Sequence, residues 1–442
     1  MNTKPEILRT KAEQALLKQF DDRFGTASDG LSALRTGALA DIRERGLPHR
    51  RVEAYKYTDL KAGFDTVPDI AERPDSKTAS ATLGAVDLWG DMPRHRIVFA
   101  DGYYMPDLSD GPVPGLAITG LAEELAAGRD VTGRIAQLKA DGPDAALDLN
   151  TAFMTDGVLI TVGADYAADK PIEIVFLTVS EKPASHYVRS ALTVGSGAGA
   201  TILESHIGRD DVATHSNAVF EVHLEDRTKV TWIKVQQCGT TATHLGSTLS
   251  VLGAEATFDH FVFTLGSRLS RSQSFLTFAE QGSKANLRGV TLLRNEEHAD
   301  VTLLVDHAVP ECMSQERFKA VIDDRAKGVF QGKIIVRPDA QQTDGRMMTQ
   351  TLLLSDHAQV ANKPELEIFA DDVQCAHGAT TGQIDEDLLF YLMARGIPEA
   401  QARTLLVLAF LGETIEEIEN EAITERLEAL SRYWLIGEES MG

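Results

Sequence analysis

A long series of short, strand-like segments between residues 150 and 370 sets the tightest limit on how this chain can fold. The segments are rich in Val, Ile, Leu, Thr and Phe, and Gly, Asp or Asn residues separate them. Many alternate apolar and polar residues, which is the period of a half-buried strand. The clearest are 158–162, 172–179, 188–194, 200–206, 219–224, 229–235, 257–265, 285–293, 301–305, 333–336, 349–354 and 365–369.

Three β architectures use many strands of one length. A sandwich closes at about seven to nine strands, which is fewer than this series contains. A propeller should repeat a blade motif about every 40 residues, and the sequence shows no such repeat. A β-helix accepts any number of strands and tolerates irregular turns between them. We therefore predict a mainly β fold, with a parallel β-helix core over residues 151–383.

Helical regions are predicted on both sides of this core. The N-terminal region, residues 1–150, should be mostly helical, although residues 96–100 resemble a strand. The C-terminal region, residues 384–442, should hold three helices, and its glutamate-rich face is interpreted as solvated rather than as a docking site. The first helical face consists of apolar residues four positions apart: Leu8, Ala12, Leu16, Phe20 and Phe24.

The charge balance excludes two classes of partner. Acidic residues outnumber basic ones by 66 to 43, which gives a formal net charge of −23. Nucleic acids and anionic membranes are bound by clusters of Lys and Arg, and the sequence has none of adequate size. The three cysteines, Cys238, Cys312 and Cys375, are too few for a secreted disulfide framework. With neither a signal peptide nor a transmembrane stretch, the chain is expected to be cytoplasmic.

Two nucleotide-binding motifs are nearly matched but fail on context. Residues 195–200, GSGAGA, approach a dinucleotide fingerprint, but a strand-like segment follows where the motif requires a helix. We interpret them as a glycine turn between coils. Residues 328–333, GVFQGK, lack the spacing and the Ser or Thr of a P-loop. If ATP is used, another subunit must bind it.

Cys375 and His377 form the pair with the clearest chemical potential. One residue separates them, so on a strand they point to the same side. A thiolate and an imidazole together suit iron or zinc, although a stable centre needs three or four ligands. Three interpretations stay open: a buried cysteine beside an exposed histidine, half of a site completed by another chain, and a catalytic Cys/His pair.

Other polar clusters support weaker hypotheses. Residues 296–300, EEHAD, with Asp306, His307 and Cys312, contain metal-ligand types, but a polar loop and a strand end explain them better. The pairs at 296–297 and 371–372 could instead serve a β-helix carbohydrate-active lyase or hydrolase, which needs paired carboxylates. A homodimeric interaction module without a metal role is a further alternative.

From residue 301 to about residue 410 the sequence resembles the SufB/SufD family of iron–sulfur cluster assembly proteins. Within the family His377-Gly378 is similar to SufD-like sequences, since SufB-like sequences have a glutamate after the histidine. Residues 50–58, RRVEAYKYT, are also similar to the SufD-like pattern, whereas residues 346–350, RMMTQ, depart from it. The matching motifs are GVFQGK at 328–333, AQQTD at 340–344, KPELEIFADDV at 363–373 and CAHGATTGQ at 375–383.

The resemblance implies a right-handed parallel β-helix between helical ends. It also implies a scaffold subunit rather than an enzyme, in a complex of one SufB, one SufD and two copies of the ATPase SufC. Such a complex would assemble and transfer iron–sulfur clusters, with help in iron acquisition as a further option. A homodimer is an additional expectation for the isolated chain.

The resemblance also assigns residues to these roles. His377 matches the position of an iron or cluster ligand at the SufB interface, and Cys375 ranks second. Iron or a cluster would be held there transiently, with no cofactor tightly bound to the isolated chain. The helices at about 384–412 match the region that docks SufC, with Leu388, Tyr391, Leu392, Arg395, Leu405 and Leu406 as the expected contact residues.

Overall fold

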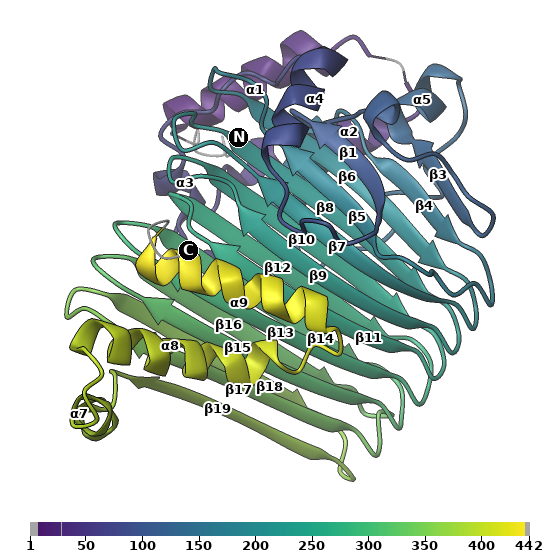
Figure 1. Ribbon diagram of the computed structural model, residues 1–442. Helices are drawn as coiled ribbons and strands as arrows, with labels where there is room; N and C mark the ends of the chain where they lie inside the picture. Colours follow the sequence, from purple (N-terminus) through teal and green to yellow (C-terminus); the bar gives the residue numbers. More distant parts are fainter. Residues whose placement is uncertain (1–7, 28, 438–442) are drawn as a thin grey trace, which may run out of the picture.

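Successive strands alternate between two sheets in the computed structural model, which describes residues 8–27 and 29–437. The chain thus winds as a flattened β-solenoid of about eight turns (Figure 1), and the predicted mainly β fold with helical ends is confirmed. Neighbouring strands within each sheet run parallel, apart from β2 and β3 at one end.

The odd-numbered strands other than β3 form a ten-stranded sheet together with β2. Its strands are β1 (His95–Ala100), β2 (Tyr103–Tyr104), β5 (Ile172–Leu177), β7 (Gly199–Ile207), β9 (Lys229–Gln237), β11 (Thr257–Leu265), β13 (Lys284–Leu293), β15 (Met313–Ile322), β17 (Asp344–Leu353) and β19 (Gln374–Gly382). We call it the odd sheet.

The remaining strands form a nine-stranded sheet, which we call the even sheet. Because β1 and β3 belong to these sheets, the sheets begin within the first 150 residues. The even strands are β3 (Leu116–Gly120), β4 (Val158–Val162), β6 (Ser185–Val194), β8 (His215–Leu224), β10 (Thr243–Leu252), β12 (Leu269–Phe278), β14 (His298–His307), β16 (Lys327–Val336) and β18 (Gln359–Ile368).

The space between the sheets holds the main core. Alternate residues of both sheets point inward, so Ile202 and Trp232 of the odd sheet meet Phe220 and Val222 of the even sheet. The glycine run at 195–199 joins β6 to β7, and Gly197 has a φ of +72°, which favours glycine. The predicted turn between coils is therefore confirmed.

Helices α1, α2 and α6 of the N-terminal region cover the outer face of the even sheet, whereas α4 packs against β1 and β5 on the outer face of the odd sheet. Phe153 of α6 packs with Tyr187, and α1 and α2 pack behind it. Helix α1 begins at Lys11, where Thr10 and Glu13 form a capping box, so the expected helical residue Leu8 lies outside it and is exposed. The helices and short turns of this region are α1 (Lys11–Phe24), α2 (Ser32–Arg45), η1 (Glu53–Tyr55), α3 (Leu60–Gly63), α4 (Ser76–Ala85), η2 (Pro106–Leu108), α5 (Leu121–Ala126) and α6 (Ala145–Phe153).

The C-terminal helices cover the outer face of the odd sheet (Figure 1). They are α7 (Glu386–Met393), α8 (Glu399–Ile415) and α9 (Glu421–Ile436). Leu411 of α8 and Leu427 of α9 bury Phe261, Phe263 and neighbouring residues of the sheet. Helix α7 instead lies beyond the last strands and projects from the body of the molecule. None of the helices in the described residues is long and apolar enough to cross a membrane.

Candidate functional site

The solenoid is open at its C-terminal end. Strands β18 and β19 end the two sheets, and within residues 8–27 and 29–437 no further strand pairs with their outer edges. Their side chains are mostly exposed or half-buried, and Ile368 and Phe369 are 42% and 60% exposed. An exposed edge with apolar side chains favours pairing with another chain.

Cys375 and His377 lie on β19 at this open end. Cys375 pairs in register with Gly345 of β17, and His377 pairs with the buried Met347. Both therefore stand on the inward face of the odd sheet, as the one-residue spacing predicts. Cys375 is half-buried against the core and His377 is exposed. The two side chains border the interior of the last coil, where another chain could reach them.

The thiol of Cys375 is not activated in the free chain. Burial raises its pKa, and the nearby carboxyls of Asp344 and Glu316 add to this effect, although a backbone hydrogen bond from Gly345 partly opposes it. The thiolate is the form that binds metal or attacks an electrophile. Cys375 therefore keeps its proton in the free chain, and an incoming cation or a group of the partner would have to displace that proton before the sulfur could bind metal.

Glu316, on β15, is a buried carboxyl that the sequence analysis did not identify. Its side chain is 1% exposed, and neither carboxyl oxygen has a hydrogen-bond partner among the described residues. Burial raises its pKa to about 8. The Ser314 hydroxyl and the Glu316 backbone N–H lie near enough to offset part of this rise in pKa, but not in hydrogen-bond geometry. At neutral pH the group is mostly a neutral acid.

We expect Glu316→Gln to change how stability depends on pH. The unfolded carboxyl loses its proton near 4.5 and the folded one near 8, so the wild type loses stability as pH rises between these values. The glutamine does not titrate. The free energy of unfolding of the wild type should fall by about 3 kcal/mol relative to the variant between pH 5 and 8. Urea unfolding across this range measures it, and parallel profiles would show that the carboxyl is solvated.

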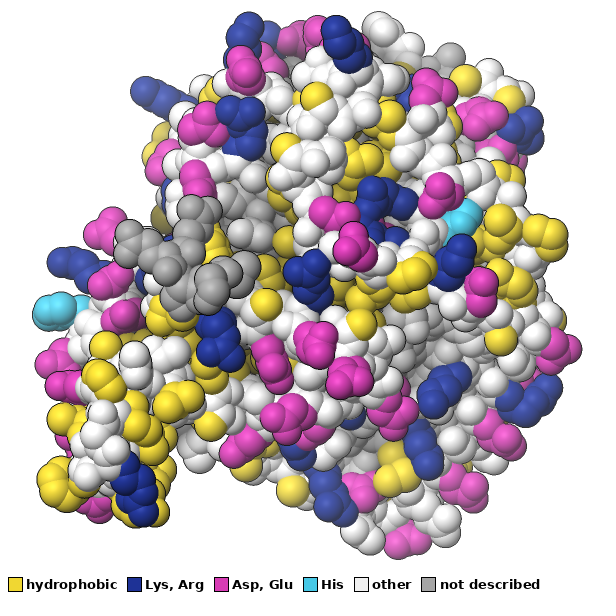
Figure 2. All heavy atoms as spheres, viewed as in Figure 1, with side chains coloured by type: hydrophobic (Ala, Val, Ile, Leu, Met, Phe, Trp, Pro, Cys, Tyr) yellow, Lys and Arg dark blue, Asp and Glu magenta, His cyan; other side chains and the backbone are white. Residues whose placement is uncertain are grey.

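Helix α7 and the start of α8 form an exposed apolar surface, which we call the arm surface. Four predicted contact residues, Leu388, Tyr391, Arg395 and Leu405, are exposed there, and Arg395 stacks on the Tyr391 ring at 3.5 Å. Figure 2 shows hydrophobic side chains gathered on this projection. The sequence analysis missed its most exposed member, Phe390, which is 73% exposed, and also Met393.

The other two predicted contact residues serve the helical packing. Leu392 and Leu406 are half-buried against the cluster that joins α8 and α9 to the odd sheet. From the sequence alone, Leu392 and Leu406 could not be told apart from Leu388 and Leu405, because all four are apolar residues of the same helices. In the structure these helices carry apolar residues both on the side that packs and on the side that faces solvent. Their part in partner contact remains a prediction.

Ionic contacts fix helix α8 to the sheet. Lys319 of β15 is buried, and its ammonium group donates to the Phe410 carbonyl at 2.6 Å and to Glu413 at 2.5 Å. Arg288 of β13 contacts Glu417, which lies just after the end of α8, at 2.8 Å. The base of the arm surface is thus held to the strands that lead, through β17, to β19.

The metal-ligand types at 296–312 are not gathered into one site. His298 and Asp300 face outward and contact the Thr58 hydroxyl, whereas His307 faces the interior and bonds Ser314 at 3.0 Å. Among the described residues, no three His, Cys, Asp or Glu side chains are placed closely enough to hold a metal ion. The interpretation as a polar loop and strand end fits this geometry.

The paired carboxylates of the carbohydrate-active alternative are also far apart. Glu296 and Glu297 lie in the turn from β13 to β14, and Asp371 and Asp372 lie in the turn from β18 to β19. Turns that leave the odd sheet and turns that leave the even sheet lie at opposite edges of a two-sheet solenoid. The two pairs cannot act on one bond.

The RRVEAYKYT segment lies across the outer face of the even sheet. Tyr55 is buried, its hydroxyl donates to Asp144 at 3.1 Å, and the Arg271 guanidinium lies 4.3 Å from its ring centre. Lys363 of β18 reaches Glu53 at 2.6 Å. The segment therefore ties the N-terminal region to the last coil.

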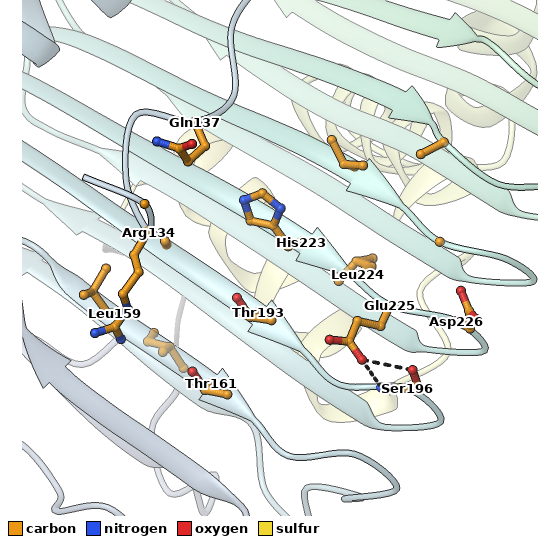
Figure 3. Close-up of a pocket in the computed structure, with 16 residues that line it drawn as sticks. Arg134, Gln137, Leu159, Thr161, Thr193, Ser196, His223, Leu224, Glu225 and Asp226 are labelled. Carbon is orange, nitrogen blue, oxygen red and sulfur yellow. Dashed lines mark hydrogen bonds between the residues drawn. The ribbon is translucent and has the colours of Figure 1, made fainter. Parts of the chain in front are cut away.

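A groove of about 660 Å³ lies on the outer face of the even sheet, under the segment that carries Arg134 and Gln137. Figure 3 shows His223 on its floor and Glu225 bonded to Ser196 at its rim. The overhanging segment is fixed by the buried carboxylate of Glu221, which accepts from the backbone N–H groups of residues 136–138 at 2.6–2.9 Å. Arg134 already faces Glu124 at 3.5 Å, and Glu225 and Asp226 also line the groove, so the groove is poorly suited to an anionic ligand.

Comparisons with known proteins agree with the resemblance drawn from the motifs. Residues 12–174 match the family described as SufBD protein N-terminal region, and residues 176–410 match the family described as SUF system FeS cluster assembly, SufBD core domain. A SufBD family iron–sulfur cluster assembly protein of Synechocystis is 30% identical over 434 residues, covering 95% of this chain and 93% of the relative.

Two further relatives span most of the chain. The iron–sulfur cluster assembly protein SufD of Escherichia coli is 28% identical over 419 residues, covering 93% of this chain and 95% of its own length. The chloroplastic protein ABCI7 of Arabidopsis thaliana is 28% identical over 415 residues, covering 90% and 84%. The similarity therefore extends well beyond the quoted motifs, into both helical regions.

Proposed function

This chain belongs to the SufBD family of iron–sulfur cluster assembly proteins, and from that membership we propose that it is the SufD-type scaffold subunit of a complex with SufB and the ATPase SufC. The observation that carries this proposal is the pair of unsatisfied surfaces at one end of the molecule. The open edges of β18 and β19 suit a second β-solenoid, and the arm surface suits a separate globular partner.

The open end would supply the joint with SufB. Strands of the partner could extend both sheets, which would bury Phe369 and satisfy the free backbone groups of the edge strands. Such pairing would enclose the inward face of β19. His377 and Cys375 would then face the partner across a shared interior.

Iron is the cargo of this site rather than a resident cofactor. His377 would supply an imidazole nitrogen and Cys375 a sulfur, and SufB would supply the remaining ligands, since two ligands do not close a stable site. A site divided between two chains can release its cluster when the chains move apart. This arrangement explains why the Cys375 thiol is not activated in the free chain.

The arm surface would dock SufC, and ATP-driven closure of two SufC subunits would move this chain against SufB. Lys319 and Arg288 hold α8 to the odd sheet, so a displacement of the arm surface reaches the strands beside β19. In this scheme the chain transmits motion and holds cargo while SufC hydrolyses ATP. The chain itself is not an enzyme, and it works in the cytoplasm.

Co-expression with the cognate SufB and SufC tests the proposal directly. We expect a complex of one copy of this chain, one SufB and two SufC subunits by size exclusion and native mass spectrometry. Deleting residues 384–442 is a poor control, because it would uncover Phe261 and Phe263 on the odd sheet. If this chain purifies alone from cells that contain folded SufB and SufC, the scaffold assignment is wrong.

We expect His377→Ala to leave this complex assembled but to lower its yield of iron–sulfur cluster roughly tenfold or more, as loss of a metal-supporting group does elsewhere. Anaerobic reconstitution followed by visible absorption and iron analysis measures the yield. His357→Ala is the matched control, since His357 is an exposed histidine in the turn between β17 and β18. Equal cluster yields from the two variants would remove His377 from the site.

A further inference from the structure

The interior of the last coils, which is lined mainly by apolar side chains, contains a glutamate. Glu316 stands on the inward face of β15, between Ser314 and Phe318, and is 1% exposed. Buried carboxyls elsewhere in this solenoid are paired; Glu204, for example, contacts Lys234 at 2.9 Å. Both oxygens of Glu316 lack a hydrogen-bond partner among the described residues. Such an arrangement costs stability, and a function in binding would account for its presence.

Strand register aligns Glu316 with the residues of the open end. Glu316 pairs with Met347 of β17, and Met347 pairs with His377 of β19, so the three form one inward row. Two strand spacings, roughly 10 Å, separate the backbones at Glu316 and His377. Carboxyl and imidazole side chains that turn toward each other can share an ion across this distance.

The neighbouring row leaves room for that movement. It consists of Ser314, Gly345 and Cys375, and a Cβ added at Gly345 would meet Ile334 at 3.6 Å and Ser314 Oγ at 3.7 Å, which are ordinary contacts. A methyl group would therefore fit at Gly345. Because glycine has none, a small gap remains between Ser314 and Cys375. Met347, which stands between Glu316 and His377, is an unbranched, flexible side chain whose sulfur packs over Gly332 of β16.

We propose that Glu316 is the inner ligand of a divalent-cation site whose outer ligands are His377 and Cys375. The inference rests on the proposed function, which makes those two residues the metal-facing pair. Carboxylate oxygen, imidazole nitrogen and thiolate sulfur together suit Fe²⁺. The site is assembled only when the cation arrives, since these side chains are not gathered in the free chain.

The chemistry of binding balances without a further reactant. The Glu316 carboxyl is held as a neutral acid by burial, which raises its pKa to about 8. When the cation binds, the O–H bond of Glu316 and the S–H bond of Cys375 are replaced by bonds to the metal, and both protons leave to solvent. One positive charge is thereby exported for each carboxylate formed, which limits the net charge brought into the interior.

Titration with Co²⁺ tests this inference, because it substitutes for Fe²⁺ without changing oxidation state. The protein is the complex of this chain with SufB and SufC, kept anaerobic, and the readouts are cobalt absorption and calorimetric affinity. We expect Glu316→Gln and His377→Ala each to weaken binding about tenfold or more. Glu225→Gln, which alters a carboxyl on the opposite side of the even sheet from the interior, should bind as the wild type does.

The outcomes separate this inference from the proposed function. If His377→Ala weakens binding while Glu316→Gln binds as tightly as the wild type, the inner ligand is wrong and the divided site stands. If the wild-type complex binds no Co²⁺, or if neither variant changes its affinity, the metal site itself is wrong. Since a glutamine nearly matches a neutral carboxyl in shape, the circular dichroism spectrum of the Glu316→Gln variant should match that of the wild type.

Discussion

Replacing Lys234 with methionine should lower the free energy of unfolding by about 3–5 kcal/mol, because it leaves a buried carboxylate without its cation. Lys234 is 2% exposed, and its ammonium group lies 2.9 Å from Glu204 inside the solenoid. His206 and Trp232 complete the contacts of Glu204, at 2.6 Å and 2.9 Å. Burial alone would raise the pKa of Glu204, but Lys234 and His206 more than offset this and hold it well below its usual range.

The double variant Lys234→Met, Glu204→Gln is the matched control for this prediction. It removes both charges, so it should recover much of the lost stability, as replacement of a whole buried pair generally does. Urea unfolding followed by circular dichroism measures all three proteins. A single variant that loses less than about 1 kcal/mol would show that water reaches Glu204 in the folded state.

The second large effect is expected at the arm surface. Leu388→Asp combined with Phe390→Asp should weaken SufC binding roughly a thousandfold, since two exposed apolar anchors are each worth 2 kcal/mol or more at an interface centre. Leu388 is 51% exposed and Phe390 is 73% exposed, so neither supports the fold. The free energy of unfolding should change by no more than about 0.5 kcal/mol. Surface plasmon resonance with immobilised SufC measures the affinity.

A charged substitution far from the arm surface controls for general effects. Val113 is 40% exposed and lies in the N-terminal region, before β3, so Val113→Asp should bind SufC as tightly as the wild type does. Unchanged binding by the double variant would place the docking site elsewhere. Pairing with SufB should survive the double variant, because the edges of β18 and β19 are untouched.

The sequence predicts the solenoid best where strands are rich in apolar residues on both faces. Residues 257–265 and 285–293 match β11 and β13 closely because their Phe, Val and Leu side chains pack both in the interior and under the C-terminal helices. Strands β10 and β12 carry a weaker signal, since small or polar residues such as Gly246, Ser272 and Ser274 occupy their inward positions. The side chains of Lys234 and His244 fill the space beside Gly246, so a larger residue would not fit there. This reason for the glycine is visible only in the folded structure.

The candidate site was predictable only in part. The sequence is enough to place Cys375 and His377 on one face, because residues two positions apart on any strand point to the same side. Glu316 was missed because its partners lie 31 and 61 residues away in sequence, and register alone brings them into one row. A signal was present nonetheless, because the alternation of the strand puts this glutamate, between Ser314 and Phe318, at an inward position.

The open edges of β18 and β19 also bear on how much of this chain a cell should produce. A second copy of the chain presents the same two edges, so self-pairing and the proposed pairing with SufB would use one surface and exclude each other. The ratio of self-paired chain to the complex with SufB would then depend on the concentrations of the two proteins. Chain in excess of SufB would accumulate in the self-paired form, which cannot bind SufB. Matched synthesis of the two subunits would keep that dead-end form scarce, and adding SufB late to preformed pairs should give slow, concentration-dependent exchange.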